Sequence, residues 1–166
     1  MSEMDFELRD RVAAPLDDVE AALLSPDFFA RLGDLPNIAA PELLDQQEDG
    51  TAVVRRVRYR FTGEVSGAVR RVVDPDKLSW VDECRYDRAA HRATHRILPD
   101  QYEKLLRCNY EEILEADGSE CVRGAIGELA VKVPLVGGRV ERAIVDGLRE
   151  RASAEAEVLA ELAAGT

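Results

Sequence analysis

The chain of 166 residues has no apolar run approaching the roughly 18–20 residues that a membrane-spanning helix needs, so no integral membrane segment is expected. Residues 1–10 are acidic and lack the basic-then-apolar order of a secretion signal. Cysteine is scarce: Cys84, Cys108 and Cys121 are an odd number without CxxC spacing, which argues against a cysteine zinc cluster and fits free thiols. Together these absences predict a cytoplasmic protein.

Positive charge is also in short supply. Lysine and arginine number 22 against 33 aspartate and glutamate residues, which gives a net charge of −11. An acidic chain is repelled by phosphate backbones, so no nucleic-acid partner is expected. One stretch is locally basic, with Arg55, Arg56, Arg58 and Arg60. We interpret it as the exposed face of a strand, where arginine stems cover apolar surface.

Familiar catalytic and cofactor motifs are missing. No P-loop, Rossmann fingerprint, GxSxG or HExxH occurs, so no cofactor is predicted. Gly137-Gly138 lacks the following Lys or Ser/Thr of a phosphate loop, which favours the simple start of a helix. The histidines His91 and His95 fall in an alternating stretch, and on a strand positions four apart lie roughly 13 Å from each other. One metal ion cannot bridge that span, so no metal site is predicted.

What the chain does contain is enough apolar material for a core. Hydrophobic residues make up 46% and charged residues 33%, and the length suits one domain, predicted over residues 1–166. Alternation over residues 5–13 predicts a strand. Pro15 and Pro26 then stand where helices begin, which predicts two short helices after that strand.

From residue 38 the apolar period changes to two. Asp49-Gly50 and Asp117-Gly118 are strong hairpin signals. Further strands are predicted over residues 38–48, 51–61, 78–86, 91–98, 104–116 and 119–133. Residues 63–73 fit either a short strand or a loop. Because hairpins join these strands, the sheet is expected to be antiparallel.

The chain closes with one long amphipathic segment, residues 139–164. Its apolar stripe is carried by Val140, Ile144, Leu148, Ala152, Ala156 and Leu159. The expected class is therefore α+β: a curved antiparallel sheet of about seven strands wrapped around a C-terminal helix. Since each strand twists away from the helix axis, side chains are not expected to fill the whole gap, and an internal cavity is predicted.

This element order resembles the helix-grip fold of the START-like (SRPBCC) superfamily. The resemblance is carried by the opening strand with its helix pair, by the Asp49-Gly50 hairpin and by residues 131–141 (VKVPLVGGRVE), and it covers nearly the whole chain. The closing segment is similar to an uncharacterised actinobacterial branch. The superfamily includes plant pathogenesis-related and pollen proteins, lipid-transfer domains and polyketide cyclases. The resemblance implies a cavity for a hydrophobic ligand but supplies no reaction.

Within the predicted strand 78–86, Asp82 is the residue that bears most on function. The more apolar face of that strand carries Leu78, Trp80, Asp82, Cys84 and Tyr86. Asp82 is therefore expected inside, where an unpaired carboxylate costs several kcal/mol. Arg55 or Arg123 would be its partner. In the other interpretation a bulge shifts the strand's phase and Asp82 is solvated.

Other polar and small residues have two interpretations each. His95 either points into the cavity as an acid/base or anchor, or lies at the surface. Ala125 and Gly127 either leave room for a ligand or let the helix pack closely. The predicted ligand-binding residues are Val57, Tyr59, Phe61, Trp80, Asp82, Cys84, Tyr86, His95, Cys108, Tyr110, Ala125, Gly127, Leu129, Ile144 and Leu148.

These residues lead to a first hypothesis: a carrier for a small hydrophobic or amphipathic ligand, lipid or polyketide-like, held between sheet and helix. The alternative is a polyketide cyclase or dehydratase that uses His95 with Asp82 or Tyr110 as acid and base. A third hypothesis, a structural module, would be favoured by a cavity smaller than about 300 Å³. The sequence leaves the oligomeric state open.

Overall fold

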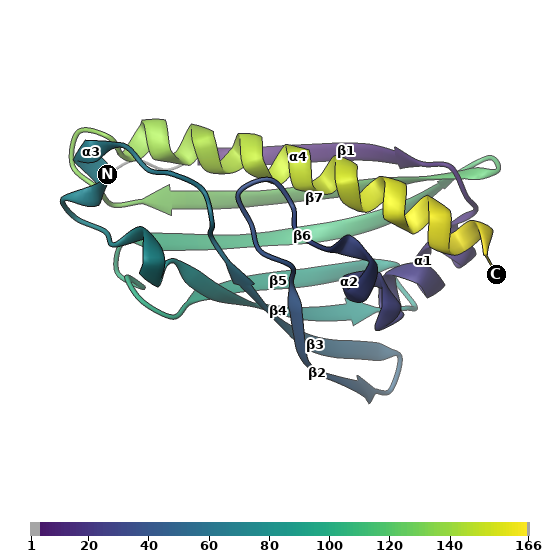
Figure 1. Ribbon diagram of the computed structural model, residues 1–166. Helices are drawn as coiled ribbons and strands as arrows, with labels where there is room; N and C mark the ends of the chain where they lie inside the picture. The colour runs from purple at the N-terminus through teal and green to yellow at the C-terminus, as the bar shows by residue number, and fades with distance from the viewer. Residues whose placement is uncertain (1–3, 166) are drawn as a thin grey trace.

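Antiparallel strands form one seven-stranded sheet with the order β1-β7-β6-β5-β4-β3-β2 in the computed structural model, which describes residues 4–165 (Figure 1). The strands are β1 (Met4–Val12), β2 (Glu42–Asp49), β3 (Ala52–Arg60), β4 (Ser79–Asp87), β5 (Arg92–Pro99), β6 (Leu106–Asp117) and β7 (Glu120–Val131). The helices are α1 (Leu16–Leu24), α2 (Asp27–Leu32), α3 (Gly67–Arg70) and α4 (Gly137–Ala164), with a 3-10 turn at Pro75–Lys77. The predicted α+β class with a long C-terminal helix is confirmed.

Local chemistry explains where the strands begin and end. Gly50 and Gly118 have φ of 63° and 64°, the left-handed conformation that the predicted hairpin turns require. The predicted strand from residue 38 begins only at Glu42. Pro41 precedes it and has no N–H for a ladder hydrogen bond. Ile38 instead forms isolated bridges with Leu35 and Phe61.

The ambiguous segment 63–73 contains no strand in the structure. It holds the short helix α3, whose N-cap residue Ser66 accepts a hydrogen bond from the backbone N–H of Val69. The segment therefore connects β3 to β4 without adding to the sheet.

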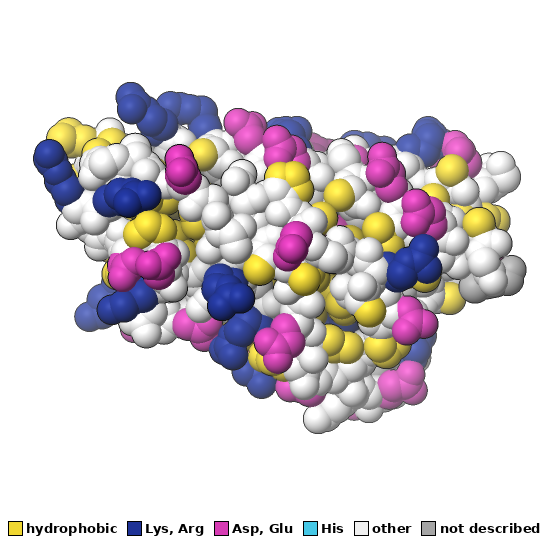
Figure 2. Space-filling model, viewed as in Figure 1, with side chains coloured by type: hydrophobic (Ala, Val, Ile, Leu, Met, Phe, Trp, Pro, Cys, Tyr) yellow, Lys and Arg dark blue, Asp and Glu magenta, His cyan; other side chains and the backbone are white. Residues whose placement is uncertain are grey.

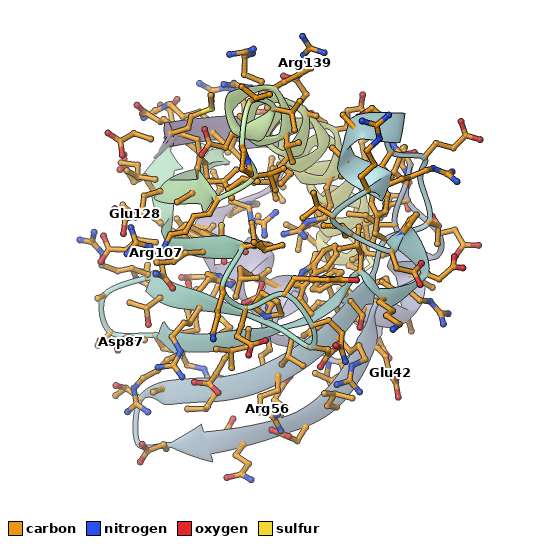
Figure 3. All side chains as sticks on the ribbon, turned by 90° about the vertical axis from the view of Figure 1, so that its left-hand side faces the viewer. Glu42, Arg56, Asp87, Arg107, Glu128 and Arg139 are labelled. Carbon is orange, nitrogen blue, oxygen red and sulfur yellow. The ribbon has the colours of Figure 1, made fainter. Side chains whose placement is uncertain are left out.

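Helix α4 lies along the concave side of the sheet and packs on β1 and β7, while α1 and α2 pack beside its C-terminal half (Figure 1). Seen end-on in Figure 3, the sheet curves below α4, with Arg139 near the start of the helix and Arg56 and Glu42 on the far strands. The described helices are either too short or too polar to cross a bilayer. On the face shown in Figure 2, acidic and basic side chains are interspersed.

The buried apolar residues form two clusters that α4 joins. One contains Phe28, Tyr59, Tyr86 and Leu159 and lies between α1, α2, the strands β3–β6 and the C-terminal part of α4. The other contains Phe6, Leu129 and Val145 and lies between β1, β6, β7 and the N-terminal part of α4. The polar groups described next lie between the two clusters.

Candidate ligand site between the sheet and helix α4

Asp82 on β4 and His95 on β5 face the interior, with exposed fractions of only 4% and 8%. His95 Nδ1 lies 2.9 Å from Asp82 Oδ1, and the hydroxyl of Tyr110 donates to Asp82 Oδ2 at 3.1 Å. The strand keeps the alternation that the sequence shows, because Asp82 and Cys84 are both buried on the same face. Asp82 thus sits inside with two hydrogen-bond donors.

His95 is held from both sides of its ring. Its Nε2 lies 2.9 Å from Glu112 Oε1 on β6, opposite the Asp82 contact at Nδ1. The ring also stacks on Tyr110, with centroids 4.3 Å apart and an interplanar angle of 7°. Both imidazole nitrogens are therefore bound to carboxylates.

The chain of contacts continues across the sheet to α4. Glu112 also binds Arg123 on β7, and Arg123 Nη1 lies 3.1 Å from Glu155 Oε2 on α4. Arg151, one turn earlier on the helix, donates from Nε to Glu155 Oε1 at 3.1 Å. We call Asp82, His95, Glu112, Arg123, Arg151 and Glu155 the buried charge cluster. It links β4, β5, β6 and β7 to the helix.

The protonation states of the cluster follow from its neighbours. Burial alone would raise the pKa of Glu112, but the charge of Arg123 and the hydrogen bond from His95 hold it well below its ordinary value of 4.5. Burial likewise opposes a low pKa for Asp82, yet His95 holds it below 3.8. Burial would lower the pKa of His95, but the charge of Asp82 raises it well above 6.5. With His95 protonated, three anions and three cations balance.

A cavity of about 40 Å³ borders the cluster. It is lined by Phe6, Leu8, Asp10, Tyr110, Glu112, Arg123, Gly124, Ala125, Leu148, Arg151, Ala152 and Glu155. This volume admits water molecules, whereas ligand pockets usually enclose about 300–1,000 Å³. The cavity that residues 4–165 form beside the cluster is therefore much smaller than the ligand-sized one predicted from the curl of the sheet. Side chains of the cluster occupy the gap instead.

A larger hollow of about 330 Å³ lies where β2 and β4 begin and β3 ends. It is lined by Ala39, Ala40, Glu42, Arg58, Arg60, Ser79 and Asp100. Arg58 and Ser79 both bind Asp100, at 3.0 and 2.7 Å. The large apolar side chains that typify ligand pockets are missing from this lining. The cavity under α4 remains the better candidate.

Three of the predicted ligand-binding residues line this cavity: Tyr110, Ala125 and Leu148. Most of the others pack in the two core clusters. Val57, Tyr59, Trp80, Cys84 and Tyr86 belong to the cluster beside α1 and α2. Cys108, Leu129 and Ile144 belong to the cluster beside β1. Asp82 and His95 lie in the charge cluster, and Phe61 bridges to Ile38 at the end of β3.

Gly127 leaves no room for a ligand. A Cβ atom there would lie 2.4 Å from Tyr110 Cβ and 2.8 Å from Phe6 Cζ, because the two rings close over the glycine. Their centroids are 6.2 Å apart. The interpretation of Gly127 as ligand space is therefore replaced by close aromatic packing.

The predicted arginine partners of Asp82 are both engaged elsewhere. Arg123 binds Glu112 and Glu155, as described above. Arg55 is buried rather than exposed, and its Nη1 donates to Leu23 O at 2.6 Å. Gln46, its cross-strand neighbour, donates to Leu24 O at 2.9 Å. Arg55 and Gln46 thus bind carbonyls at the C-terminal end of α1, which has no basic residue in its last turn.

The charged residues Glu112, Arg151 and Glu155 were not among the predicted site residues, and Arg123 was predicted only as a partner of Asp82. Their spacing was nevertheless informative. Glu112 is two residues from Tyr110, and Arg123 is two residues from Ala125, so both share an inward strand face. On α4, Arg151 and Glu155 are three and seven residues after Leu148, the spacing of one helix face. The charge of these residues concealed the pattern, because a search for apolar periodicity treats each charged position as an interruption of the apolar face.

The histidines have different environments. His91 lies in the turn between β4 and β5, with φ of 53°, and its Nδ1 is 2.6 Å from Glu20 Oε2. Tyr86 donates to the same carboxylate oxygen at 2.5 Å. This contact ties α1 to the turn, while His95 lies inside the sheet.

Solved structures with the same architecture are numerous at low sequence identity. Protein TTHA0849 from Thermus thermophilus aligns with a TM-score of 0.66 and 14% identity, covering 99% of this chain and 98% of that one. The Zhui aromatase/cyclase from a Streptomyces species aligns with a TM-score of 0.65 and 16% identity, covering 98% and 94%. A norcoclaurine synthase point mutant from Thalictrum flavum gives 0.61 and 16%, covering 96% of each chain.

These likenesses establish the helix-grip fold, as the sequence resemblance predicted. Among curated protein sequences, none matches the chain. A family profile does match, over residues 7–162, which is nearly the whole chain. The chain belongs to the family described as "Protein of unknown function (DUF2505)".

Proposed function

We propose that the protein binds a small amphipathic molecule, lipid or polyketide-like, between the sheet and α4. The observation that supports this most directly is the buried charge cluster beside a cavity with apolar walls. Phe6, Leu8 and Leu148 supply apolar surface, and Arg123, Arg151 and Glu155 supply polar groups. Ligand sites combine these features: a mostly apolar wall with a few placed polar groups.

The cluster is hard to explain by stability alone. Replacing buried ion pairs by apolar side chains of similar volume is often neutral or stabilising, because desolvation opposes the attraction of the charges. Here six ionisable residues separate two apolar clusters that could otherwise have merged beneath α4. Recognition of a ligand by this polar interior would explain why these residues are charged, whereas packing alone does not.

Ligand admission requires the helix to move, because the existing cavity is too small. Ser153 on α4 and Asp10 on β1 make an exposed hydrogen bond of 3.3 Å at the edge of the cavity. A solvent-exposed contact of this kind contributes little to stability. Separation of α4 from β1 would leave the charge cluster intact, although it would also part Phe6 and Leu8 from the apolar side chains of the helix.

The similar structures are consistent with small-molecule chemistry in this fold. They include an aromatase/cyclase and a synthase in complex with a transition-state analogue. Since the identities are below 20%, they support the architecture of the site and leave the ligand to experiment.

The enzymatic alternative is favoured by the burial of His95 with Asp82 and Tyr110. An acid/base histidine must offer a nitrogen to the substrate. Both nitrogens of His95 are bound to carboxylates here, so a substrate would have to displace Asp82 or Glu112. Binding without turnover therefore fits the observed geometry better. The small cavity favours the third hypothesis, a structural module, and binding experiments separate it from both.

Native mass spectrometry of the protein purified from its own host tests the proposal. We expect a bound small molecule that is lost on denaturation. Ala152 lines the cavity, so Ala152→Leu should fill it and abolish the bound species. Ala143→Leu, on the exposed side of α4, is the control and should retain it. Apo protein from the host, together with no saturable binding of fluorescent fatty acids or aromatic polyketides, would refute the proposal.

A further inference from the structure

Arg151 differs from the other cations of the buried charge cluster because both of its terminal guanidinium nitrogens are without a carboxylate partner. It is nine-tenths buried on α4 and lines the cavity. Its Nε binds Glu155 at 3.1 Å, and its guanidinium lies over the ring of Tyr59, 4.9 Å from the centroid. Nη1 and Nη2 have no hydrogen-bond partner among residues 4–165.

Those two nitrogens border open space. In the described part of the chain, Gln46 Oε1 is the side-chain polar atom that is both fully enclosed and without a partner. The terminal nitrogens of Arg151 also lack a partner but are not fully enclosed. They therefore keep accessible surface although the residue is buried. A guanidinium fixed at Nε and stacked on a ring presents its remaining donors in a set direction.

Arg123 has less to offer a ligand. Its Nε binds Glu112 and its Nη1 binds Glu155, so carboxylates hold it on two sides and Nη2 is its one remaining terminal nitrogen. Arg55 lies beside α1, bound to Leu23 O and stacked on Phe29. Within the described residues, Arg151 is therefore the buried cation best placed to meet a molecule entering the cavity.

The charge balance of the cluster selects the kind of acceptor. Asp82, Glu112 and Glu155 are balanced by Arg123, Arg151 and protonated His95. A ligand carboxylate would add an uncompensated negative charge in a buried site, which is costly. A neutral carbonyl accepts hydrogen bonds from the guanidinium without changing the balance.

We propose that Arg151 is the recognition residue for a neutral carbonyl oxygen on an otherwise apolar ligand, bound against Phe6, Leu148 and Tyr110. This inference rests on the proposed function, because it concerns the same site. It assigns the ligand class as apolar ketones, esters or amides rather than free acids or hydrocarbons.

Three naphthalenes test this by isothermal titration or by their own fluorescence. 2-Acetylnaphthalene carries the carbonyl, 2-isopropenylnaphthalene replaces its oxygen by a CH₂ group of similar shape, and 2-naphthoate carries a charge. We expect wild type to bind the ketone at least about tenfold more tightly than the alkene, the size of a hydrogen bond to a charged group. The ketone should also bind more tightly than the carboxylate.

The variant Arg151→Met/Glu155→Met removes both charges of the pair and keeps the cluster neutral, since Arg123 retains Glu112. It should bind ketone and alkene equally, while Arg149→Met, exposed on the same helix, keeps the preference. Equal binding of ketone and alkene by wild type, a preference for the carboxylate, or a preference that survives in the double variant would overturn the role of Arg151 and leave the proposed function standing. Absence of saturable binding for all three compounds would count against both.

Discussion

His95 is the residue on which the polar interior depends. Its two nitrogens join carboxylates from β4 and β6, and its ring stacks on Tyr110. Alternation along β4 and β5 indicates which side chains face inward, but it does not reveal their partners. Alternation thus put Asp82 inside in one of the two interpretations, and the structure confirms that one. Its pairing with His95 instead of an arginine depends on the register Cys84↔His95 and on strand twist.

Glu112 is the residue whose loss should be felt most. It binds both His95 and Arg123 and is 3% exposed. Glu112→Gln removes one of the two carboxylates that each of His95 and Arg123 binds and leaves the buried cluster with a net positive charge. Breaking a buried pair on one side costs about 3–5 kcal/mol. Chemical denaturation in urea should show a loss of this order in the free energy of unfolding.

Glu111, the next residue on β6, provides the matched control. It faces outward and pairs with Arg92 at 3.2 Å, with half of each side chain exposed. Glu111→Gln should change the free energy of unfolding by less than about 1 kcal/mol. Equal effects at the two positions would show that the buried pairs contribute no more than surface ones.

At the level of elements, the sequence predicted the strands and helices well because their signals are local. Gly50 and Gly118 mark hairpins, and Pro15 marks a helix start. The inner face of α4 was predicted only in part. Val140, Ile144 and Leu148 do pack inward, but Arg151 and Glu155 continue the same face as charges. A search for apolar periodicity cannot find these two positions, because charged side chains occupy them and partners on the strands stabilise those charges.

Packing between elements explains a glycine that the sequence could interpret in two ways. Gly127 on β7 lies under Phe6 of β1 and Tyr110 of β6. Gly127→Ala would place its Cβ 2.5 Å from the backbone oxygen of Asn109, which a side-chain rotation cannot relieve. We expect a loss of about 1–3 kcal/mol in the free energy of unfolding.

Gly124 on the same strand is the control for that substitution. A Cβ there meets Leu8 O at 3.7 Å, an ordinary van der Waals distance. Gly124→Ala should be near neutral or slightly stabilising, because alanine restricts the unfolded chain. A thermal melt in which both variants behave alike would contradict the close packing of Phe6 and Tyr110 over Gly127.

The whole molecule carries a net charge of −11, whereas the charges inside the buried cluster balance. Interspersed surface charges, seen on one face in Figure 2, give weak contacts that salt screens. The buried cluster is shielded from salt, so pH is the variable that tests it. Its balance of three anions and three cations holds only while His95 keeps its proton.

Stability should therefore peak on the acidic side of neutrality. The raised pKa of His95 gives a contribution that is complete below about pH 6.5 and is lost as pH rises through the folded-state value. The lowered pKa values of Asp82 and Glu112 give contributions that are complete above their ordinary 3.8 and 4.5 and are lost on acidification. Urea unfolding at several pH values should show a maximum between about pH 4.5 and 6.5. His95→Gln should be less stable throughout and lose the decline between about pH 6.5 and 7.5, a range that ends about one unit below the ordinary thiol pKa. A wild-type curve that rises over this range would mean that His95 is neutral in the folded protein.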